Sequence, residues 1–223
     1  MRRARAAVPF VALLVLAPVV TAQGGPITPL GWNWRTDAPA TPRRGAAETL
    51  RADQFEFSLM APGWHITMGP GGILYDGTEA AEGRFVIEGE LILFPDASNE
   101  EYGVFIGGTD LTGDGQGWLA FVVRGDGQAA VIRSEAGQRS MLMDWTPYAT
   151  VKPRASGGTA KNLVMVRAEP DSVRFVVNGE RVAAWPRAAV AADGAFGFRI
   201  GRGVNLHITN LDLTRRLAPF PRR

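Results

Sequence analysis

The sequence predicts a single all-β domain built as a sandwich. From Gln54 onward, short runs rich in Val, Ile, Phe and Leu alternate with clusters of Gly, Asp, Asn and Pro. This spacing is typical of β-strands joined by turns, and no stretch of useful length repeats its apolar residues with the period of an amphipathic helix. The 223 residues, 46% of them hydrophobic, can bury a sizeable core, and all-β domains of this length commonly stay undivided.

Two hairpins can be placed from their turns. Asn178-Gly179 predicts a two-residue type I′ turn, because both central positions of that turn need positive φ. A regular hairpin there pairs Phe175 with Val182 and puts both on one apolar face. Another hairpin is expected to join residues 118–123 to residues 129–133 through a Gly-Asp-Gly turn.

The Gly201-Arg202-Gly203 turn predicts a further hairpin. The apolar residues on either side of it share a parity and are expected to point inward: Phe196, Phe198, Ile200, Val204, Leu206 and Ile208. Direct pairing of the two strands would set Arg199 opposite Asn205, with His207 diagonal to Arg199, on the face away from the core. This trio is either a solvated face or part of a ligand site. The parity flip after Ile208 indicates a bulge.

Residues 1–22 have the pattern of a secretory signal peptide. A basic start is followed by the apolar run Ala6–Val20, and small residues precede Gln23. The alternative is an uncleaved membrane anchor, but a span needs about 20 apolar residues, and this run is shorter and contains two prolines. We expect cleavage after Ala22, no membrane span in the mature chain, and a secreted or periplasmic protein.

Export changes the meaning of the net charge. The full chain has 24 basic and 22 acidic residues. The predicted signal peptide contains three arginines and no acid, so the mature chain would keep 21 basic and 22 acidic residues, a net charge of about −1. The basic pI therefore gives no support for nucleic-acid binding, which needs a clustered positive surface. The chain contains no cysteine, so disulfides and thiolate metal sites are excluded.

Residues 23–50 form a proline-rich segment that we interpret as a linker or an extended arm, followed by the sandwich domain at residues 51–223. Trp32 and Trp34 share a parity within this arm. A pure linker seldom contains two tryptophans, so these two residues could lie on the sandwich as an edge segment.

Several motifs resemble those of one superfamily. The stretches Lys161–Val166 and Val173–Val182 resemble the N-x-L-x-V and V-x-F-x-V-N-G-x-x-V hairpin of laminin-G-like and other concanavalin-A-like domains. Gly83–Glu90 and Tyr102–Phe105 resemble the paired strands of this superfamily that come before the hairpin. Pro62–Pro70 resembles stretches in exported bacterial proteins of unassigned function that have the same sandwich. The resemblance covers about residues 53–215 and implies a concanavalin-A-like jelly-roll sandwich. It is specific for fold and weak for function, because lectins, glycosidases, adhesion modules and spacers share this sandwich.

Catalysis has little support in the sequence. Glycoside hydrolysis needs two carboxylates on either side of the sugar bond, and the glucanases of this fold carry three acids on one strand. The nearest pattern is Glu88-Gly89-Glu90, which lacks the central Asp and the third Glu. We interpret it as a solvated strand face. None of the serines has the flanking glycines of a nucleophile elbow.

One loop has the composition of a cation site. Asp110 and Asp114 lie within Asp110–Gly115, and calcium takes several oxygen ligands from such loops. The loop lacks the length and terminal Glu of an EF-hand, so an ordinary polar turn is the alternative. Apart from calcium at this loop, we expect no cofactor. His65 and His207 are the only histidines, which leaves no spacing for a zinc site.

Carbohydrate recognition uses aromatic rings and planar polar groups. Residues of these types near predicted turns and strand ends are the candidate ligand contacts: Trp64, His65, Tyr102, Trp118, Arg124, Trp145, Arg199, Asn205 and His207. Core packing is the alternative for each tryptophan. We therefore expect an exported, non-catalytic module whose partner is a glycan or another extracellular polymer. A glycan-active hydrolase and a structural or protein-binding module are the alternatives.

Overall fold

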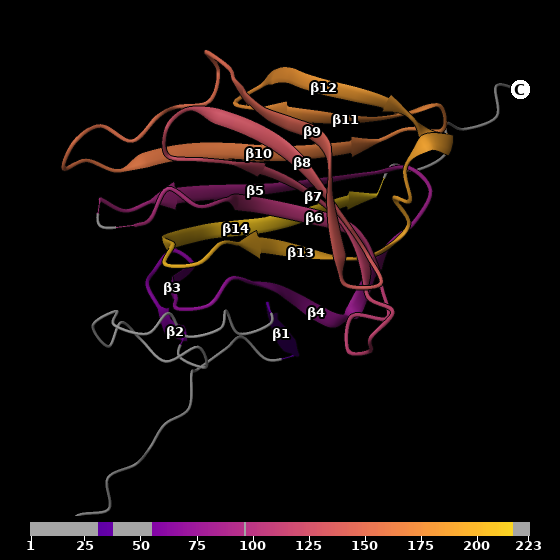
Figure 1. The fold of residues 1–223 in the computed structure, drawn as a ribbon, viewed down its shortest axis with the longest axis horizontal. Helices are drawn as coiled ribbons and strands as arrows, with labels where there is room; N and C mark the ends of the chain where they lie inside the picture. The colour runs from indigo at the N-terminus through magenta and orange to yellow at the C-terminus, as the bar shows by residue number, and fades with distance from the viewer. Residues whose placement is uncertain (1–30, 38–54, 96, 216–223) are drawn as a thin grey trace, which may run out of the picture.

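The structure is a computed structural model that describes residues 31–37, 55–95 and 97–215. It is a sandwich of two seven-stranded antiparallel sheets, as the sequence predicts (Figure 1). The predicted signal peptide lies outside the described residues, as does most of the predicted arm. Within the described part of the chain, no helix is long and apolar enough to span a membrane.

The first sheet, sheet A, is formed by strands from both ends of the chain. In order across the sheet its strands are β1 (Trp32–Thr36), β4 (Gly72–Ala81), β13 (Gly194–Ile200), β6 (Tyr102–Thr109), β7 (Gly117–Val123), β8 (Gln128–Glu135) and β9 (Gln138–Pro147). The edge strand β1 comes from the predicted arm, and the Trp32 ring stacks on Phe198 with centroids 5.8 Å apart. The edge segment suggested by the two tryptophans is therefore part of the sandwich.

The second sheet, sheet B, faces sheet A across the core. In order its strands are β12 (Glu180–Pro186), β11 (Ser172–Val177), β10 (Ala160–Ala168), β5 (Phe85–Leu93), β14 (Asn205–Arg215), β3 (Trp64–Met68) and β2 (Phe55–Leu59). A short 3₁₀ helix, η1 (Arg187–Ala189), follows β12. Buried and more exposed residues alternate along β5 and β10, because one face of each strand packs in the core and the other faces outward.

Sheet A is buried on both faces at its centre. Strands β6, β7 and β8 are buried at nearly every position, unlike the alternating strands of sheet B. Their inward residues join the main core, and their outward residues form a second apolar cluster. The outer face of sheet A therefore has a small core of its own.

The predicted Asn178-Gly179 hairpin is confirmed, with a change of register. It joins β11 to β12, and the φ angles of these two residues are +50° and +88°, as a type I′ turn requires. A register shift between Phe175 and Val176 then places Phe175 opposite Ala183. The predicted pairing of Phe175 with Val182 is wrong because a bulge adds a residue to one strand, which a turn-based register does not foresee. The hairpin of residues 118–123 and 129–133 is confirmed.

The predicted hairpin at Gly201-Arg202-Gly203 is wrong in its pairing. Strand β13 belongs to sheet A and β14 to sheet B, so the turn carries the chain from one sheet to the other. The prediction that the apolar residues of both strands point inward is confirmed, because these residues lie in the main core. Arg199 and Asn205, however, point away from that core on opposite sides of the sandwich. The predicted bulge is confirmed between Ile208 and Asn210.

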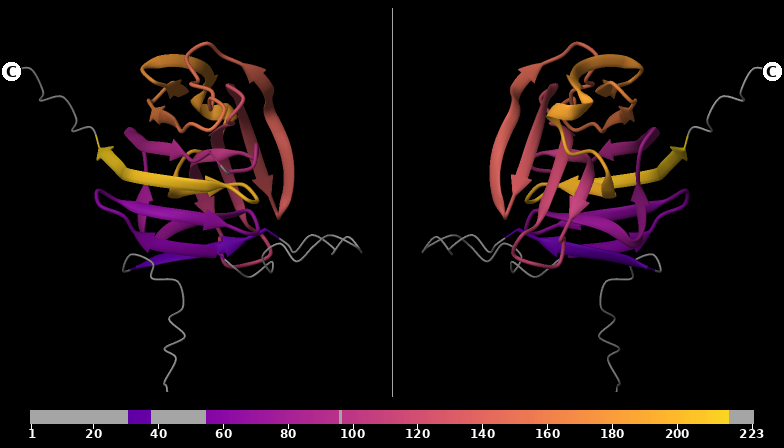
Figure 2. Two further views of the ribbon diagram at one scale, coloured as in Figure 1. Left: turned by 90° about the vertical axis from the view of Figure 1, so that its left-hand side faces the viewer. Right: turned by 90° about the vertical axis from the view of Figure 1, so that its right-hand side faces the viewer.

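Sheet A curls so far that its two edges approach each other. Arg139 on edge strand β9 forms an ion pair with Asp37, which directly follows edge strand β1. Figure 2 shows the long curved strands of residues 117–147 bending toward β1 and β4. The outer face of sheet A is therefore concave, and side chains from its two edges meet over it.

Candidate functional site

The floor of this concave face is apolar. Nine residues of β4, β6, β7, β8 and the β6–β7 loop form the cluster: Ile73, Tyr75, Phe105, Leu111, Trp118, Ala120, Val122, Ala130 and Ile132. The β6–β7 loop folds over the floor and buries Leu111. Arg35 on β1 fixes the loop by donating hydrogen bonds to the carbonyl oxygens of Leu111, at 3.0 Å, and Gly113. The middle of the face is thus filled by the protein's own side chains.

An ion cluster of Asp37, Glu101, Arg139 and Arg199 lies over one part of the floor, with Glu101 and Arg199 buried and Arg139 at its exposed edge. Arg199, 1% exposed, donates from Nη1 and Nη2 to the two oxygens of Asp37 at 2.9 and 2.7 Å. Its Nη2 also lies 2.7 Å from Glu101 Oε1. Arg139 pairs with the same two acids. The two positive and two negative charges compensate one another, so the charge of Arg199 is neutralised by acids of the protein itself.

The cluster holds both of its carboxyl groups ionised. Burial by itself raises the pKa of Asp37, but hydrogen bonds and charge from Arg199, with a contribution from Arg139, lower it overall. The pKa of Glu101 is lowered by the same balance between burial and the two arginines. Opposite charges held close by in a poorly solvated site favour the charged form of an acid.

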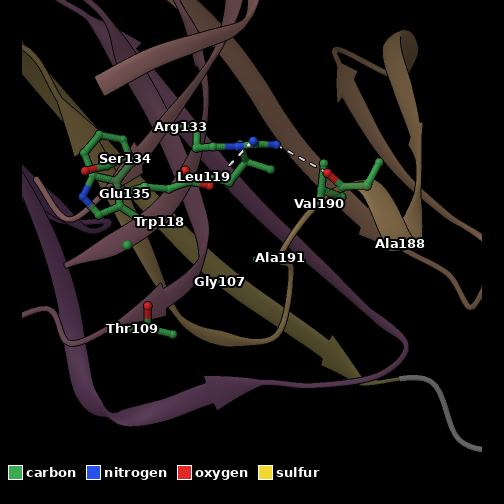
Figure 3. Close-up of a pocket in the computed structure, with 12 residues that line it drawn as sticks. Gly107, Thr109, Trp118, Leu119, Arg133, Ser134, Glu135, Ala188, Val190 and Ala191 are labelled. Atoms are coloured by element: carbon green, nitrogen blue, oxygen red, sulfur yellow. Dashed lines mark hydrogen bonds and ion pairs between the residues drawn. The ribbon is translucent and has the colours of Figure 1, made fainter. Parts of the chain in front are cut away.

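A pocket of about 400 Å³ opens at one end of the sandwich (Figure 3). Its walls come from the ends of β6, β7 and β8 and from residues 188–191 beside η1. Arg133 is paired with Leu119 of the main core, so its side chain points to the inner side of sheet A. Trp118 and Ser134, directly opposite each other on β7 and β8, point to the concave face instead. Trp118 Nε1 and Ser134 Oγ are both buried, and neither has a hydrogen-bond partner in the described structure.

Charged groups and a hydroxyl line the rest of the pocket. Arg133 Nη1 lies 3.6 Å from Glu135 Oε1, and Arg133 Nη2 donates to the carbonyl oxygen of Ala189 at 3.4 Å. Figure 3 shows Arg133 extending from its strand toward the segment that contains Val190. Thr109 adds a hydroxyl to the lining. The pocket thus offers a hydroxyl group and a planar ion pair within one small space.

An aromatic–cation stack lies elsewhere on the same face. The Arg124 guanidinium lies 3.7 Å from the centroid of the Trp145 ring. Glu100 is near this stack and makes a side-chain hydrogen bond with Glu101. Burial, the bond to Glu101 and the Glu101 charge together raise the pKa of Glu100. The two adjacent glutamates therefore have pKa values shifted in opposite directions.

Four predicted ligand contacts share the concave face of sheet A: Trp118, Arg124, Trp145 and Arg199. Three others lie on the opposite, outer face of sheet B: His65, Asn205 and His207. His65 is directly opposite His207, and His207 Nε2 lies 2.9 Å from the carbonyl oxygen of Pro62. The predicted trio of Arg199, Asn205 and His207 is therefore divided between two faces of the molecule.

The remaining two aromatic candidates pack within the protein. Tyr102 is fully buried in the main core, its hydroxyl accepts a hydrogen bond from Asn162 at 3.1 Å, and burial raises its pKa to about 12. Trp64 is half-buried and packs on Phe57 with ring centroids 5.0 Å apart. Both rings therefore pack against other side chains of the protein, which was the alternative to a ligand contact.

The predicted cation loop is folded around one of its own acids. Asp110 Oδ2 accepts a hydrogen bond from the Gly115 amide at 2.9 Å, and Asp110 has a φ of +46°. Asp114 is exposed. Among the described residues no group of three or more His, Cys, Asp or Glu side chains could hold a metal ion. The geometry is that of a polar turn, and calcium binding stays a prediction.

Sequence reasoning missed Ser134, Arg133 and the acids of the ion cluster. Ser134 could have been found, because extending the predicted hairpin of residues 118–123 by one pair sets it opposite Trp118. The cluster had no such signal, because Asp37 and Arg199 are 162 positions apart in the chain. Only the curl of sheet A brings them together.

Comparison with known proteins identifies the fold. No family model and no curated protein matches the sequence, but solved structures match the fold. Carbohydrate-binding module CBM66 from Bacillus subtilis has a TM-score of 0.57 and 10% identity over 82% of this chain and 95% of its own. The VIP36 exoplasmic/lumenal domain, bound to Ca²⁺ and Man3GlcNAc, has a TM-score of 0.54 and 10% identity over 86% of each chain.

A third similar structure is an enzyme. A glycoside hydrolase family 16 protein of the Bacteroides ovatus mixed-linkage glucan locus, in complex with a G4G4G3G product, has a TM-score of 0.52 and 11% identity over 82% of this chain and 94% of its own. Identities this low show the fold alone. The chain has the concanavalin-A-like jelly-roll sandwich that its sequence motifs predict.

Proposed function

We propose that this protein is a non-catalytic carbohydrate-binding module, and that the pocket lined by Thr109, Arg133 and Glu135 holds a sugar. The observation that carries the proposal is the ion pair at this pocket, in which Arg133 Nη1 and Glu135 Oε1 lie 3.6 Å apart. Sugar hydroxyls accept hydrogen bonds from a guanidinium and donate them to a carboxylate. One bound sugar would therefore bond to both charged groups.

The size and composition of the pocket agree with this role. Small-molecule sites usually measure about 300 to 1,000 Å³ and combine apolar walls with a few placed polar groups. Leu119 and Val190 supply apolar surface for sugar C–H groups. Arg133 and Glu135 supply planar donors and acceptors at the same pocket. Two proteins of the same fold, the CBM66 module and the VIP36 domain bound to Man3GlcNAc, add support.

A glycan-active hydrolase is the second candidate, and one observation favours it. The pKa values of Glu100 and Glu101 are shifted in opposite directions, which is the pattern of an acid–base pair. Hydrolysis, however, needs the two carboxyl groups about 5 to 9 Å apart, whereas these two are hydrogen-bonded to each other. Glu101 is also held by Arg199 and Arg139. We therefore favour binding without catalysis.

The two acids that the sequence offered for catalysis, Glu88 and Glu90, also favour binding without catalysis. Glu88 and Glu90 lie on β5 in sheet B and face outward, away from the pocket. Glu90 forms an ion pair with Lys161 at 2.6 Å. Asp212 on β14 is directly opposite Glu88, so these acids belong to the outer face of sheet B.

Binding can be tested on a panel of soluble polysaccharides and oligosaccharides. We expect retention of at least one glycan by the wild-type protein without new reducing ends. Arg133→Gln removes a charged hydrogen-bond donor, worth about 1.5 to 3 kcal/mol, and should weaken that binding at least tenfold. Arg202→Gln is the matched control, because Arg202 is an exposed arginine at the β13–β14 turn. New reducing ends would favour the hydrolase, and equal binding by both variants would place the sugar elsewhere.

We also propose that the protein acts outside the cytoplasm, in the periplasm or beyond the cell. The pattern of residues 1–22 supports this. Intact-mass measurement of protein recovered from the periplasm or medium should show a chain that begins at Gln23. Recovery of a chain that retains its first 22 residues would contradict the proposal.

A further inference from the structure

A row of three arginines crosses the outer face of sheet B, apart from the proposed sugar pocket. Arg167, Arg174 and Arg181 lie on the neighbouring strands β10, β11 and β12. Arg167 is directly opposite Arg174, and Arg181 is opposite Val176, two positions along from Arg174. The three side chains line a hollow of about 500 Å³ together with Met165, Val176 and Gly179.

None of these arginines has an ion-pair partner among the described residues. Other cations of the protein do: Arg84 pairs with Glu169 at 2.9 Å, and Lys161 with Glu90 at 2.6 Å. The Nε atom of Arg167 is buried and makes no hydrogen bond within the described structure. Like charges directly opposite each other on neighbouring strands are destabilising. The row therefore concentrates uncompensated positive charge in a hollow.

The acids of this face lie on other strands. Glu88 on β5 is opposite Met165 on β10, and Asp212 on β14 is opposite Glu88. Burial, then the charge of Asp212, raises the pKa of Glu88, and Glu88 makes no ion pair with any arginine of the row. The outer face of sheet B is therefore divided into a basic half and an acidic half, and only the basic half carries the hollow.

We infer that the arginine row of Arg167, Arg174 and Arg181 is a second binding site, for the carboxylate or sulfate groups of an acidic polysaccharide. A guanidinium binds carboxylate and sulfate groups through two parallel hydrogen bonds. Neighbouring strands are about 4.8 Å apart, so Arg167 and Arg174 lie one strand spacing apart, and Arg181 lies two positions farther along on the next strand. The apolar surface of Met165 and Val176 between them suits sugar C–H groups.

Other polyanions fit this surface less well. Single-stranded nucleic acids bind where aromatic rings stack on bases, and the outward residues of β10, β11 and β12 include no aromatic side chain. A bilayer surface would call for apolar anchors that enter the lipid. The arginines are instead set around a hollow among half-buried residues. An acidic polysaccharide matches both the charge and the shallow apolar floor.

The test is direct binding of the full-length protein to polygalacturonate, which carries carboxylates, and to dextran sulfate, which carries sulfates, with neutral dextran as the blank. We expect binding to at least one acidic polymer and at least a tenfold loss in the R167Q/R174Q/R181Q variant. Arg181→Gln alone should cost a few-fold, because Arg181 is exposed and its removal leaves the fold intact. The matched control, Arg202→Gln, removes an exposed arginine at the β13–β14 turn and should leave binding unchanged.

Three results would overturn the inference: no binding to either acidic polymer, equal binding by the triple variant, or tighter binding to single-stranded DNA or anionic vesicles than to both polymers. Arg133→Gln should leave acidic-polymer binding unchanged, because Arg133 lies on β8 in sheet A and not in the arginine row. If Arg133→Gln failed to weaken neutral-glycan binding, only the pocket proposal would be contradicted, so the two proposals fail separately.

Discussion

The outer faces of the two sheets use arginine in opposite ways. On sheet A, Arg199 is 1% exposed and surrounded by two carboxylates. On sheet B, Arg174 is half-buried, faces another arginine, and has no acid within ion-pair distance in the described structure. Each lies on an outward-facing strand position, so the position in the strand does not decide the role. The curl of the sheet decides it, because only sheet A brings its edges together over its own face.

Removing Arg199 is the strongest test of the contrast between the two faces. Arg199→Ala leaves Asp37 and Glu101 in a poorly solvated site with only Arg139 nearby. Breaking a buried ion pair by deleting one partner costs about 3 to 5 kcal/mol, so we expect a loss of that size in the free energy of unfolding, measured by urea denaturation. A solvated position for Arg199, which the sequence allowed, would give only a small loss.

Arg174→Ala is the matched change on sheet B. It should alter the free energy of unfolding by no more than about 0.5 kcal/mol, as surface substitutions usually do. Equal effects of the two substitutions would mean that the ion cluster contributes no more than an exposed arginine. The contrast between the two faces would then be lost.

The second prediction concerns acid. The pKa values of Asp37 and Glu101 are lowered in the folded protein, so their contribution is present above the unfolded value of about 4 and is lost as pH falls through the folded values. The free energy of unfolding should therefore fall as pH drops below about 4. Glu100 has a raised pKa and acts in the opposite direction, since its protonation relieves a penalty.

Asp37→Asn provides the check on this assignment. The variant should be less stable than the wild type at pH 7, and its stability should fall less steeply on acidification, measured by urea denaturation between pH 7 and pH 3. Asp114→Asn, at an exposed acid on the β6–β7 loop, should retain the wild-type slope. Parallel curves for all three proteins would contradict a role of Asp37 in acid sensitivity.

The fold was predictable because its signals are local. Two positive φ angles at Asn178-Gly179 follow from the residue types alone, and strand parity follows from alternation. The partner of β13 was not predictable from Gly201-Arg202-Gly203. A short glycine turn joins strands within a sheet or between sheets, and both arrangements point the same apolar residues into one core. The sequence therefore predicts which residues face inward, but not which outward residues become neighbours.

The third prediction uses Ser134, the buried serine opposite Trp118. Ser134 is 2% exposed and its hydroxyl makes no hydrogen bond in the described structure. Ser134→Ala removes a buried polar group that carries a cost without a ligand, so the free protein should keep its stability or gain up to about 1 kcal/mol. A thermal melt without sugar measures this, with Ser140→Ala as the control. A loss above 1 kcal/mol would indicate a structural role for Ser134.

The smallest effect is expected at the arginine row. Arg167 and Arg174 are directly opposite each other, and like charges in that arrangement cost about 0.2 to 1 kcal/mol. Arg174→Gln should therefore stabilise the free protein by a few tenths of a kcal/mol at low salt, measured by urea denaturation. The gain should shrink as salt rises, because ions at 1 M screen exposed charges beyond about 3 Å. Arg174→Lys keeps the charge and should show neither the gain nor its salt dependence. A gain that persists at 1 M salt would mean that packing against Met165 and Val176, rather than repulsion, governs this position.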